Sequence, residues 1–328
     1  MFMPKAVVRR ILCRTTPLAL FFGTLFPAAA EQIFQRTYQA SAYVTILSVP
    51  IFSRSHVGYG WAREGKRVGS GSNTVELEFL SGSIPERAGG LNRFGYIQES
   101  VEENGTAAIR AQYFGLITAN REESLHDAKA ALNTGSQSEV PYVAASARIE
   151  DGRAHCSVRH LLLPAPSKSA TADLMHVVKA SFETASRNTL DADKNFSVPT
   201  PNTFLYSLRQ LMLSPDTTSR SEFVYSAKTY ILSTAKHRDA KVEGEMRHRG
   251  LATENAPVLR LNGIIENNAL HERTEFALWY QEDAATTLPL RFEFRPKSYL
   301  KLVFDAVGEW EPAPAQAPHI NETGLSFR

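Results

Sequence analysis

The sequence predicts a mainly β protein: one strongly curved antiparallel sheet, or an open half-barrel, with two or three helices packed on it. Three observations lead to this prediction. Short runs rich in β-branched and aromatic residues alternate apolar with polar positions, as in Val75–Leu80. Turn dipeptides such as Asn104-Gly105 and Asp151-Gly152 separate such runs. Apolar residues at helical spacing are confined to the middle of the chain.

The first thirty residues have the features of an export signal. A basic segment with Lys5, Arg9, Arg10 and Arg14 is followed by a short apolar run over residues 18–26. Small residues then lead to Ala30, after which we expect cleavage by signal peptidase. A retained membrane anchor is the alternative, but the apolar run is shorter than the roughly 20 residues that span a bilayer. The sequence therefore predicts a periplasmic or secreted protein.

The charge of the processed chain argues against nucleic-acid binding. The full sequence has 36 Lys and Arg against 34 Asp and Glu, a net charge of +2. Cleavage after Ala30 removes four basic residues and no acidic one, which leaves 32 against 34 and a net charge of −2. Such a mixed surface lacks the positive field that attracts a phosphate backbone. We expect no nucleic-acid partner, and no run after residue 30 predicts a transmembrane segment.

Residues 31–165 are expected to form an N-terminal β-rich part with one helix. The first strand-like runs are Tyr38–Val49, Val75–Leu80, Gly95–Glu102 and Ala107–Ile117. A Gly-rich passage after Pro50 is expected to be a loop. The predicted helix begins at Asn120 and stops before Gly135. The following runs are expected to pair as a hairpin around Asp151-Gly152: Tyr142–Ile149 and His155–Leu163.

Residues 166–310 are expected to combine helices with an antiparallel β meander. Helical spacing predicts one helix from about Ala170 to Ser186 and a short one after Asn202. Seven later runs look like strands: Ser221–Tyr225, Thr229–Ser233, Ala240–Gly244, Val258–Asn262, Arg273–Tyr280, Leu290–Phe294 and Tyr299–Phe304. Residues 311–328 are expected to be a disordered tail. A domain boundary between Leu163 and Ser169 and one continuous sheet are both compatible with this pattern.

No residue pattern predicts a catalytic set, a metal site or a cofactor. The segment Gly69–Ser72 lacks the strand–turn–helix setting of a nucleophile elbow, and the nine histidines lack zinc-ligand spacing. Cys156, the only cysteine after residue 30, is expected to be buried and unreactive, since His155 points to the opposite face of the strand. A β-rich hydrolase with its acids on separate strands stays open as an alternative.

Two segments rich in glycine and arginine, Pro50–Trp61 and Pro85–Arg93, are the best places to expect a ligand site. Their side chains could bind an anionic group, and the donors are Arg54, Arg87, Asn92 and Arg93. An apolar floor would come from Phe52, Tyr59 or Trp61. Turn chemistry explains the same residues, because glycine and asparagine permit positive φ and an arginine commonly pairs with a carboxylate such as Glu86 or Glu99. We favour the turn interpretation and keep the ligand site as the competing hypothesis.

Three segments stand out in the C-terminal part of the chain: Asn202–Arg209, Leu278–Asp283 and Leu288–Phe294. Through these segments, about residues 200–305 resemble an exported bacterial family known only as domain of unknown function 3108. Trp279 and Asp283 hold the positions of the family's strand end, and Leu288-Pro289 follows. The resemblance implies a curved antiparallel sheet like that of periplasmic lipoprotein carriers, without an established activity. Residues 31 to 165 match no family that we can name.

Trp279 is the last candidate ligand contact. It lies in an alternating run with Phe276, Leu278 and Tyr280, which places large aromatics on both faces of the strand. One face would pack on the helices and the other would line a concave surface; a core tryptophan is the alternative. The leading functional hypothesis is an exported, non-catalytic envelope protein that binds an apolar or amphipathic, lipid-like ligand in the curved sheet. A β-rich hydrolase and a structural interaction module are the alternatives.

Overall fold

The computed structural model of the chain describes most of residues 31–307. The described ranges are 31–46, 49–69, 71–90, 92–105, 107–119, 139–164, 178–180, 182, 191–267, 269–282, 284–297 and 299–307. Residues 1–30, the helix expected from Asn120, the tail expected from residue 311 and Asp283 lie outside these ranges. Residues 178–180 and 182 are helical, within the helix expected from Ala170 to Ser186.

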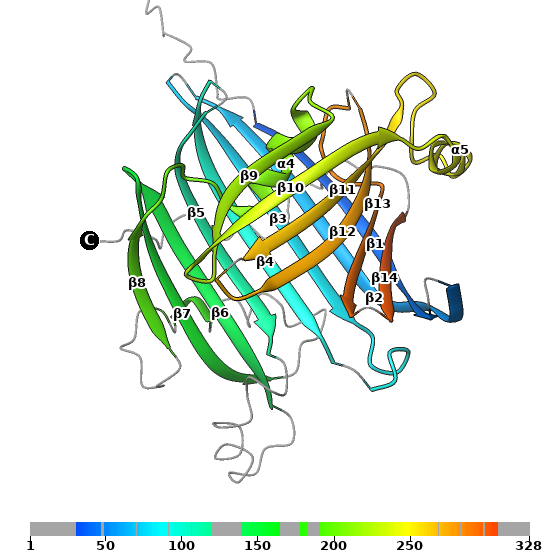
Figure 1. The fold of residues 1–328 in the computed structure, drawn as a ribbon, viewed down its shortest axis with the longest axis horizontal. Coiled ribbons are helices and arrows are strands. Elements are labelled where there is room, and N and C mark those ends of the chain that lie inside the picture. Colours follow the sequence, from blue (N-terminus) through cyan, green and yellow to red (C-terminus); the bar gives the residue numbers. More distant parts are fainter. Residues whose placement is uncertain are drawn as a thin grey trace, which may run out of the picture.

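The sheet has fourteen strands, and its neighbouring strands pair antiparallel (Figure 1). In chain order the elements are β1 (Glu31–Ile46), β2 (Val49–Val68), β3 (Asn73–Ser83), β4 (Phe94–Asn104), β5 (Ala107–Thr118), β6 (Glu139–Glu150), β7 (Arg153–Pro164), β8 (Ala192–Ser197), α4 (Phe204–Leu213), β9 (Thr218–Tyr225), β10 (Lys228–Arg238), α5 (Ala240–His248), β11 (Val258–Asn267), β12 (Glu272–Gln281), β13 (Arg291–Lys297) and β14 (Leu300–Val307). The expected fold class, a mainly β protein with a curved antiparallel sheet, is confirmed.

One long-range pairing joins the two parts of the chain. Strands β1 to β8 are neighbours in chain order, as are β9 to β14, and β1 pairs with β14 from Thr37–Val307 to Val44–Leu300. The sheet is therefore continuous across the two parts that the sequence distinguished. Its ends are β8 and β9, between which no pairing is found within the described residues.

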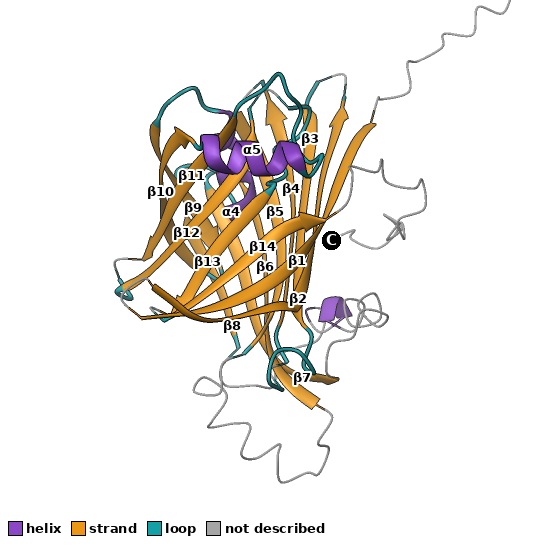
Figure 2. Cartoon of the chain, turned by 90° about the vertical axis from the view of Figure 1, so that its right-hand side faces the viewer, coloured by secondary structure: helices purple, strands orange, loops and turns teal. Residues whose placement is uncertain are grey.

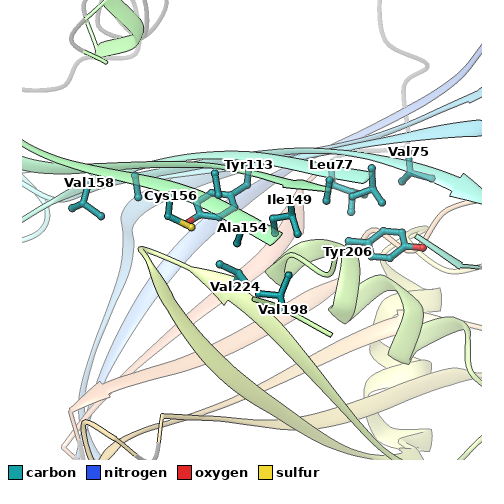
Figure 3. Close-up of a cluster of buried hydrophobic side chains, with 14 residues drawn as sticks. Val75, Leu77, Tyr113, Ile149, Ala154, Cys156, Val158, Val198, Tyr206 and Val224 are labelled. Atoms are coloured by element: carbon teal, nitrogen blue, oxygen red, sulfur yellow. The ribbon is translucent and has the colours of Figure 1, made fainter. Parts of the chain in front are cut away.

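The sheet curves so that β9 to β13 lie over β3 to β6, with α4 between the two layers (Figures 1 and 2). We call the face turned toward the other layer the inner face. Its largest buried cluster joins side chains of the first layer, such as Val75, Tyr113 and Cys156, to Tyr206 of α4 and Val224 of β9 (Figure 3). The largest part of the apolar core thus lies between the layers, where alternating strand residues meet. Smaller buried clusters lie on the outer face, around Phe94 and Tyr142 and beneath α5.

Two sequence predictions of local structure were wrong. Ala240–Gly244 is not a strand but the first part of α5, which begins after Asp239, whose carboxylate accepts a hydrogen bond from the Val242 amide at 3.1 Å. This is the geometry of a helix N-cap. The passage after Pro50 is not a loop but the first half of β2, which pairs with β1 and contains a register shift opposite Ala40 and Ala42. The short edge strand β8 was not predicted.

The start of α4 is held by a carboxylate from the opposite layer. Glu99 of β4 is 1 % exposed and accepts hydrogen bonds from the Thr203 hydroxyl (2.6 Å) and from the amides of Leu205 and Tyr206 (2.8 Å each). These amides belong to the first turn, whose N–H groups have no partner inside the helix. A negative charge at this position also complements the helix dipole. Glu99 therefore replaces an N-cap side chain, although it lies 104 positions before Thr203 in the sequence.

Carboxylates from two strands hold the middle of α4, and a cation and a hydroxyl from two others hold its end. Arg209 forms ion pairs with Glu64 of β2 (2.9 Å) and Glu103 of β4 (3.5 Å). At the C-terminal end, the Lys236 ammonium donates to the carbonyls of Met212 and Ser214, and the Tyr280 hydroxyl donates to Met212. The helix thus joins β2 and β4 of one layer to β10 and β12 of the other.

The pKa of Glu99 generates a testable pH dependence. Burial raises the pKa of this carboxyl to about 7 from an ordinary 4.5, against the effect of its hydrogen bonds. Because the pKa of the folded state is the higher one, the stability contributed by this group is fully present below about pH 4.5 and is lost as pH rises through 7. We expect the free energy of unfolding to fall by roughly 2–3 kcal/mol over this window, and Glu99→Gln to remove this slope.

Urea unfolding of both proteins at pH 4.5 to 8 measures the slope separately from any constant loss caused by the substitution. Glu102→Gln is the matched control, because Glu102 is the neighbouring carboxylate on β4 and forms an exposed pair with Arg110 at 3.3 Å. The burial argument would be contradicted if the stability of the unmodified protein rose with pH across this window and that of the Glu99→Gln variant did not.

Candidate functional site

The inner face is apolar across β12, β13, β14, β1 and β2 near one end of the sheet. Cross-strand register places Phe276 opposite Phe294, Phe294 opposite Leu302, and Leu302 opposite Ala42. The next positions outward are Leu300, Val44 and Phe52, which also face one another across β14, β1 and β2. Since directly opposed residues share a face of the sheet, these side chains form one surface. We call these seven residues the apolar inner surface.

Exposure increases along this surface from the core outward. In the deeper row, Leu278 is 2 % and Phe304 8 % exposed. In the apolar inner surface, Phe294 is 36 % and Phe52 58 % exposed, and the remaining members are partly buried. A single exposed apolar side chain is ordinary, but a contiguous apolar surface of this kind is typical of a binding site.

Aromatic packing holds the deeper row in place beneath the apolar inner surface. The rings of Phe292 and Phe304 stack with centroids 4.3 Å apart, and Phe79 and Tyr38 meet Phe292 edge to face at 5.2 and 5.3 Å. Such pairs add roughly 0.5–1.5 kcal/mol beyond the burial of their area. The surface therefore rests on a rigid aromatic base that joins β1, β3, β13 and β14.

A glycine supports the other side of the surface. Gly263 lies opposite Phe276, and a Cβ atom added to it would meet the Phe276 ring at 2.1 Å. The far end of the ring therefore occupies the space that a side chain at position 263 would take. Any larger residue at this position would push the Phe276 ring out of its place in the surface.

Arg54 lies at the edge of the apolar inner surface. It is directly opposite Ala42, on the same face, and it is exposed. Its Nη1 atom lies 4.0 Å from the position that a Cβ of Gly89 would occupy. Gly89 belongs to the turn that follows β3, together with the exposed Arg87. The structure thus places Arg54, one of the predicted ligand residues, at the edge of the surface and next to the turn that contains Arg87.

The remaining candidate residues of these two segments have positions that the fold itself explains. Arg93 donates to the carbonyl of Ala119 at 2.8 Å, and its backbone pairs with Ser83, so it braces the connection between β3 and β4. Asn92 is partly buried in the same connection. Trp61 is opposite Leu80 on β3 and lies on the outer face, with Tyr59, so neither provides a floor beside Arg54. Of the three aromatic candidates, only Phe52 shares the face of Arg54.

Trp279 lies on the outer face, beneath α5. It is 3 % exposed and packs with Val242 and Met246 of that helix. Its indole nitrogen donates to Asp239 at 2.9 Å, and the Arg260 guanidinium lies 4.9 Å from the ring centroid. Trp279 is thus a core residue that attaches α5 to the sheet. It has no place in the apolar inner surface.

The buried carboxylates of the inner face are engaged in holding the chain together. Glu99 does not pair with an arginine, as the turn interpretation expected, but with α4. Glu64 accepts from the amide of Thr287 and the hydroxyl of Thr286, both at 2.7 Å, in addition to pairing with Arg209. These acids lie on separate strands, as the hydrolase alternative requires. Their hydrogen bonds and ion pairs, however, are formed with other groups of the same chain and hold its segments together.

Cys156 is buried, as expected, and its environment is unfavourable for a nucleophile. It is 2 % exposed, and burial raises the pKa of its thiol to about 11. His155 is exposed and contacts Asn195 at 2.7 Å on the other face of β7.

Among the described residues, no group of three or more His, Cys, Asp or Glu side chains could hold a metal ion. No helix in these ranges combines the length and apolarity of a membrane span.

Comparisons with known proteins show a likeness in structure alone. No family model matches the chain, and no curated protein matches it. Among solved structures, the β-barrel-like protein of domain of unknown function DUF1849 from Brucella abortus superposes with a TM-score of 0.47 and 8 % identity. The match covers 87 % of this chain and 100 % of that one. The resemblance to domain of unknown function 3108 stays a prediction.

Sequence reasoning missed most of the apolar inner surface, although it predicted strands at several of its positions. Phe294 and Leu302 fall in predicted strands, but nothing local shows that Leu302 lies opposite Ala42 of β1, about 260 positions earlier in the chain. The usable signal was Phe52-x-Arg54 in β2, where an apolar and a cationic residue two positions apart share a face.

The turn between β3 and β4 gives a prediction that separates backbone geometry from ligand binding. Gly89 and Gly90 have φ values of +66° and +80°, which side chains with a Cβ rarely adopt. We expect Gly89→Ala to lower the free energy of unfolding by ~1 kcal/mol or more. Arg93→Lys should cost less than ~1 kcal/mol, because it replaces one hydrogen bond to a carbonyl.

Thermal unfolding of the two variants tests this prediction. Gly71→Ala is the control, since a Cβ there meets nothing within 4 Å and its φ is not in the left-handed region. A Gly89→Ala variant as stable as the unmodified protein, together with an unfolded Arg93→Lys variant, would show that both halves of the argument are wrong.

Proposed function

We propose that this protein is an exported, non-catalytic envelope protein that binds an apolar or amphipathic, lipid-like ligand on the inner face of its curved sheet. The observation that supports this is the apolar inner surface, whose exposure rises from the aromatic core to Phe52. Buried apolar area stabilises a complex by about 25 cal/mol per Å² of surface removed from water, so a ligand with an alkyl chain has a clear source of affinity here.

The filled end of the inner face supports the same proposal. Helix α4 and the segment with Thr286 and Thr287 occupy that end, where the polar contacts of Glu64 and Glu99 are satisfied within the chain. The apolar inner surface lies further along the same strands and begins at Phe276, which packs against the buried cluster that includes Met212 of α4. The seven residues that form it have apolar side chains, so a ligand there would gain mainly from burial of apolar area.

Binding of a fluorescent apolar probe tests this function. We expect N-phenyl-1-naphthylamine to bind with enhanced emission, and Phe294→Glu to weaken its binding roughly tenfold, because a carboxylate would be buried by the ligand. Val307→Glu is the matched control: Val307 is 38 % exposed, close to the 36 % of Phe294, and lies on the outer face. Equal binding by the two variants would place the probe elsewhere.

Export is tested on the protein from its own host. We expect the isolated native protein to begin at Glu31, after processing at Ala30. N-terminal sequencing checks this, and an intact Met1 would contradict it. Native mass spectrometry of the same sample should show an additional mass from a co-purifying amphiphile, which extraction with organic solvent removes.

A further inference from the structure

We propose that the ligand of the apolar inner surface is a single-chain amphiphile with an anionic head group, held by the guanidinium of Arg54, with a contribution from Arg87 of the neighbouring turn. This proposal rests on the proposed function, because it assigns the head group of the same ligand. Arg54 is a cation that shares its face with Ala42, Leu302 and Phe52. An alkyl chain along those residues would bring its head group to Arg54.

Arg54 has no carboxylate partner within the described ranges, unlike several arginines of the sheet and of α4. Arg63 pairs with Glu78 at 2.6 Å, Arg209 with Glu64 at 2.9 Å and Arg291 with Asp305 at 2.6 Å. Within the described ranges, by contrast, the side chains of Arg54 and Arg87 form no ion pair and no hydrogen bond. Their donors are therefore available to a ligand, whereas those of the paired arginines are occupied.

The surroundings of Arg54 restrict where its donors can point. One side of the guanidinium faces the turn at Gly89, where Nη1 lies 4.0 Å from the place that a Cβ would take, and the side chain rises from the strand beside Phe52. Gly89 needs its positive φ, so the turn cannot easily shift away. The planar fork of arginine binds carboxylate or phosphate oxygens in pairs, which lysine cannot reproduce.

Charge complementarity selects the anionic class of amphiphile. A cationic head group would be repelled by Arg54 and Arg87, and an uncharged one would leave their charge without a partner. Carboxylate and phosphate head groups share the chemistry that the guanidinium recognises, and the two are distinguished by direct comparison. An alkyl chain of about ten carbons spans roughly the width of two to three paired strands, which are 4.7–4.9 Å apart.

The test measures displacement of N-phenyl-1-naphthylamine from the full-length protein by decanoate, decyl phosphate, decanol and decylamine at pH 7.5 and low salt. We expect decanoate or decyl phosphate to bind at least tenfold more tightly than decanol, and decylamine to bind more weakly than decanol. Arg54→Gln should abolish the preference for the anion while the affinity for decanol is unchanged. Arg54→Lys should retain part of the preference, and Arg87→Gln should reduce it.

Arg220→Gln is the matched control, since Arg220 is also exposed and lies on the outer face of β9. If the unmodified protein binds decanol and decanoate equally, or if Arg220→Gln removes the preference as Arg54→Gln does, the head-group assignment is wrong and the proposed function stands. If neither the probe nor any decyl compound binds, the proposed function itself fails. The two failures are thereby distinguishable.

Discussion

The inner structure of this protein depends on how one short buried helix satisfies the polar groups at its two ends. Helix α4 has ten residues, and Thr203 at its N-cap makes no capping hydrogen bond with its own side chain. Glu99 supplies the acceptor from one layer, and Lys236 and Tyr280 supply donors from the other. The acceptor and the donors satisfy the amides and the carbonyls that have no partner inside the helix. A helix that is capped by both layers fixes the distance and the orientation between them.

Apolar contacts alone would not give this arrangement, because burial of apolar area has no direction. The paired charges of Arg209, Glu64 and Glu103 do have direction, and removing one partner of such a buried pair typically costs ~3–5 kcal/mol. Glu64 also binds the segment at Thr286 and Thr287. One network therefore determines where α4 and this segment lie, and it fills one end of the inner face. Beyond this filled end, the same strands carry the apolar inner surface.

Most of the fold could be predicted from the sequence, but little of the candidate site could. Alternation located strands such as β3 and β14, and helical spacing located α4, because these signals are local. At Ala240–Gly244 the alternation of a few residues was outweighed by a capping aspartate, a signal that was present in Asp239 but not used. The role of Glu99 could not be predicted, because an acid in an alternating strand gives no sign of a helix N-terminus 104 positions later. The same limit applies to Arg54, whose apolar neighbours come from β13 and β14 and are defined only by register.

Continued alternation at strand ends does not by itself explain the apolar inner surface. Strand β12 changes to a polar residue beyond this surface: Thr274 holds the inner position next to Phe276, on the side away from the core. A sequence under no constraint except folding could do the same at Phe294 and Phe52, where polar residues would keep the surface in contact with water without cost to the core. Apolar residues are found instead across five neighbouring strands, beside an arginine that the chain leaves without a carboxylate within its described residues. Binding of an amphiphile accounts for both features together, since its chain covers the apolar residues and its head group pairs with the arginine.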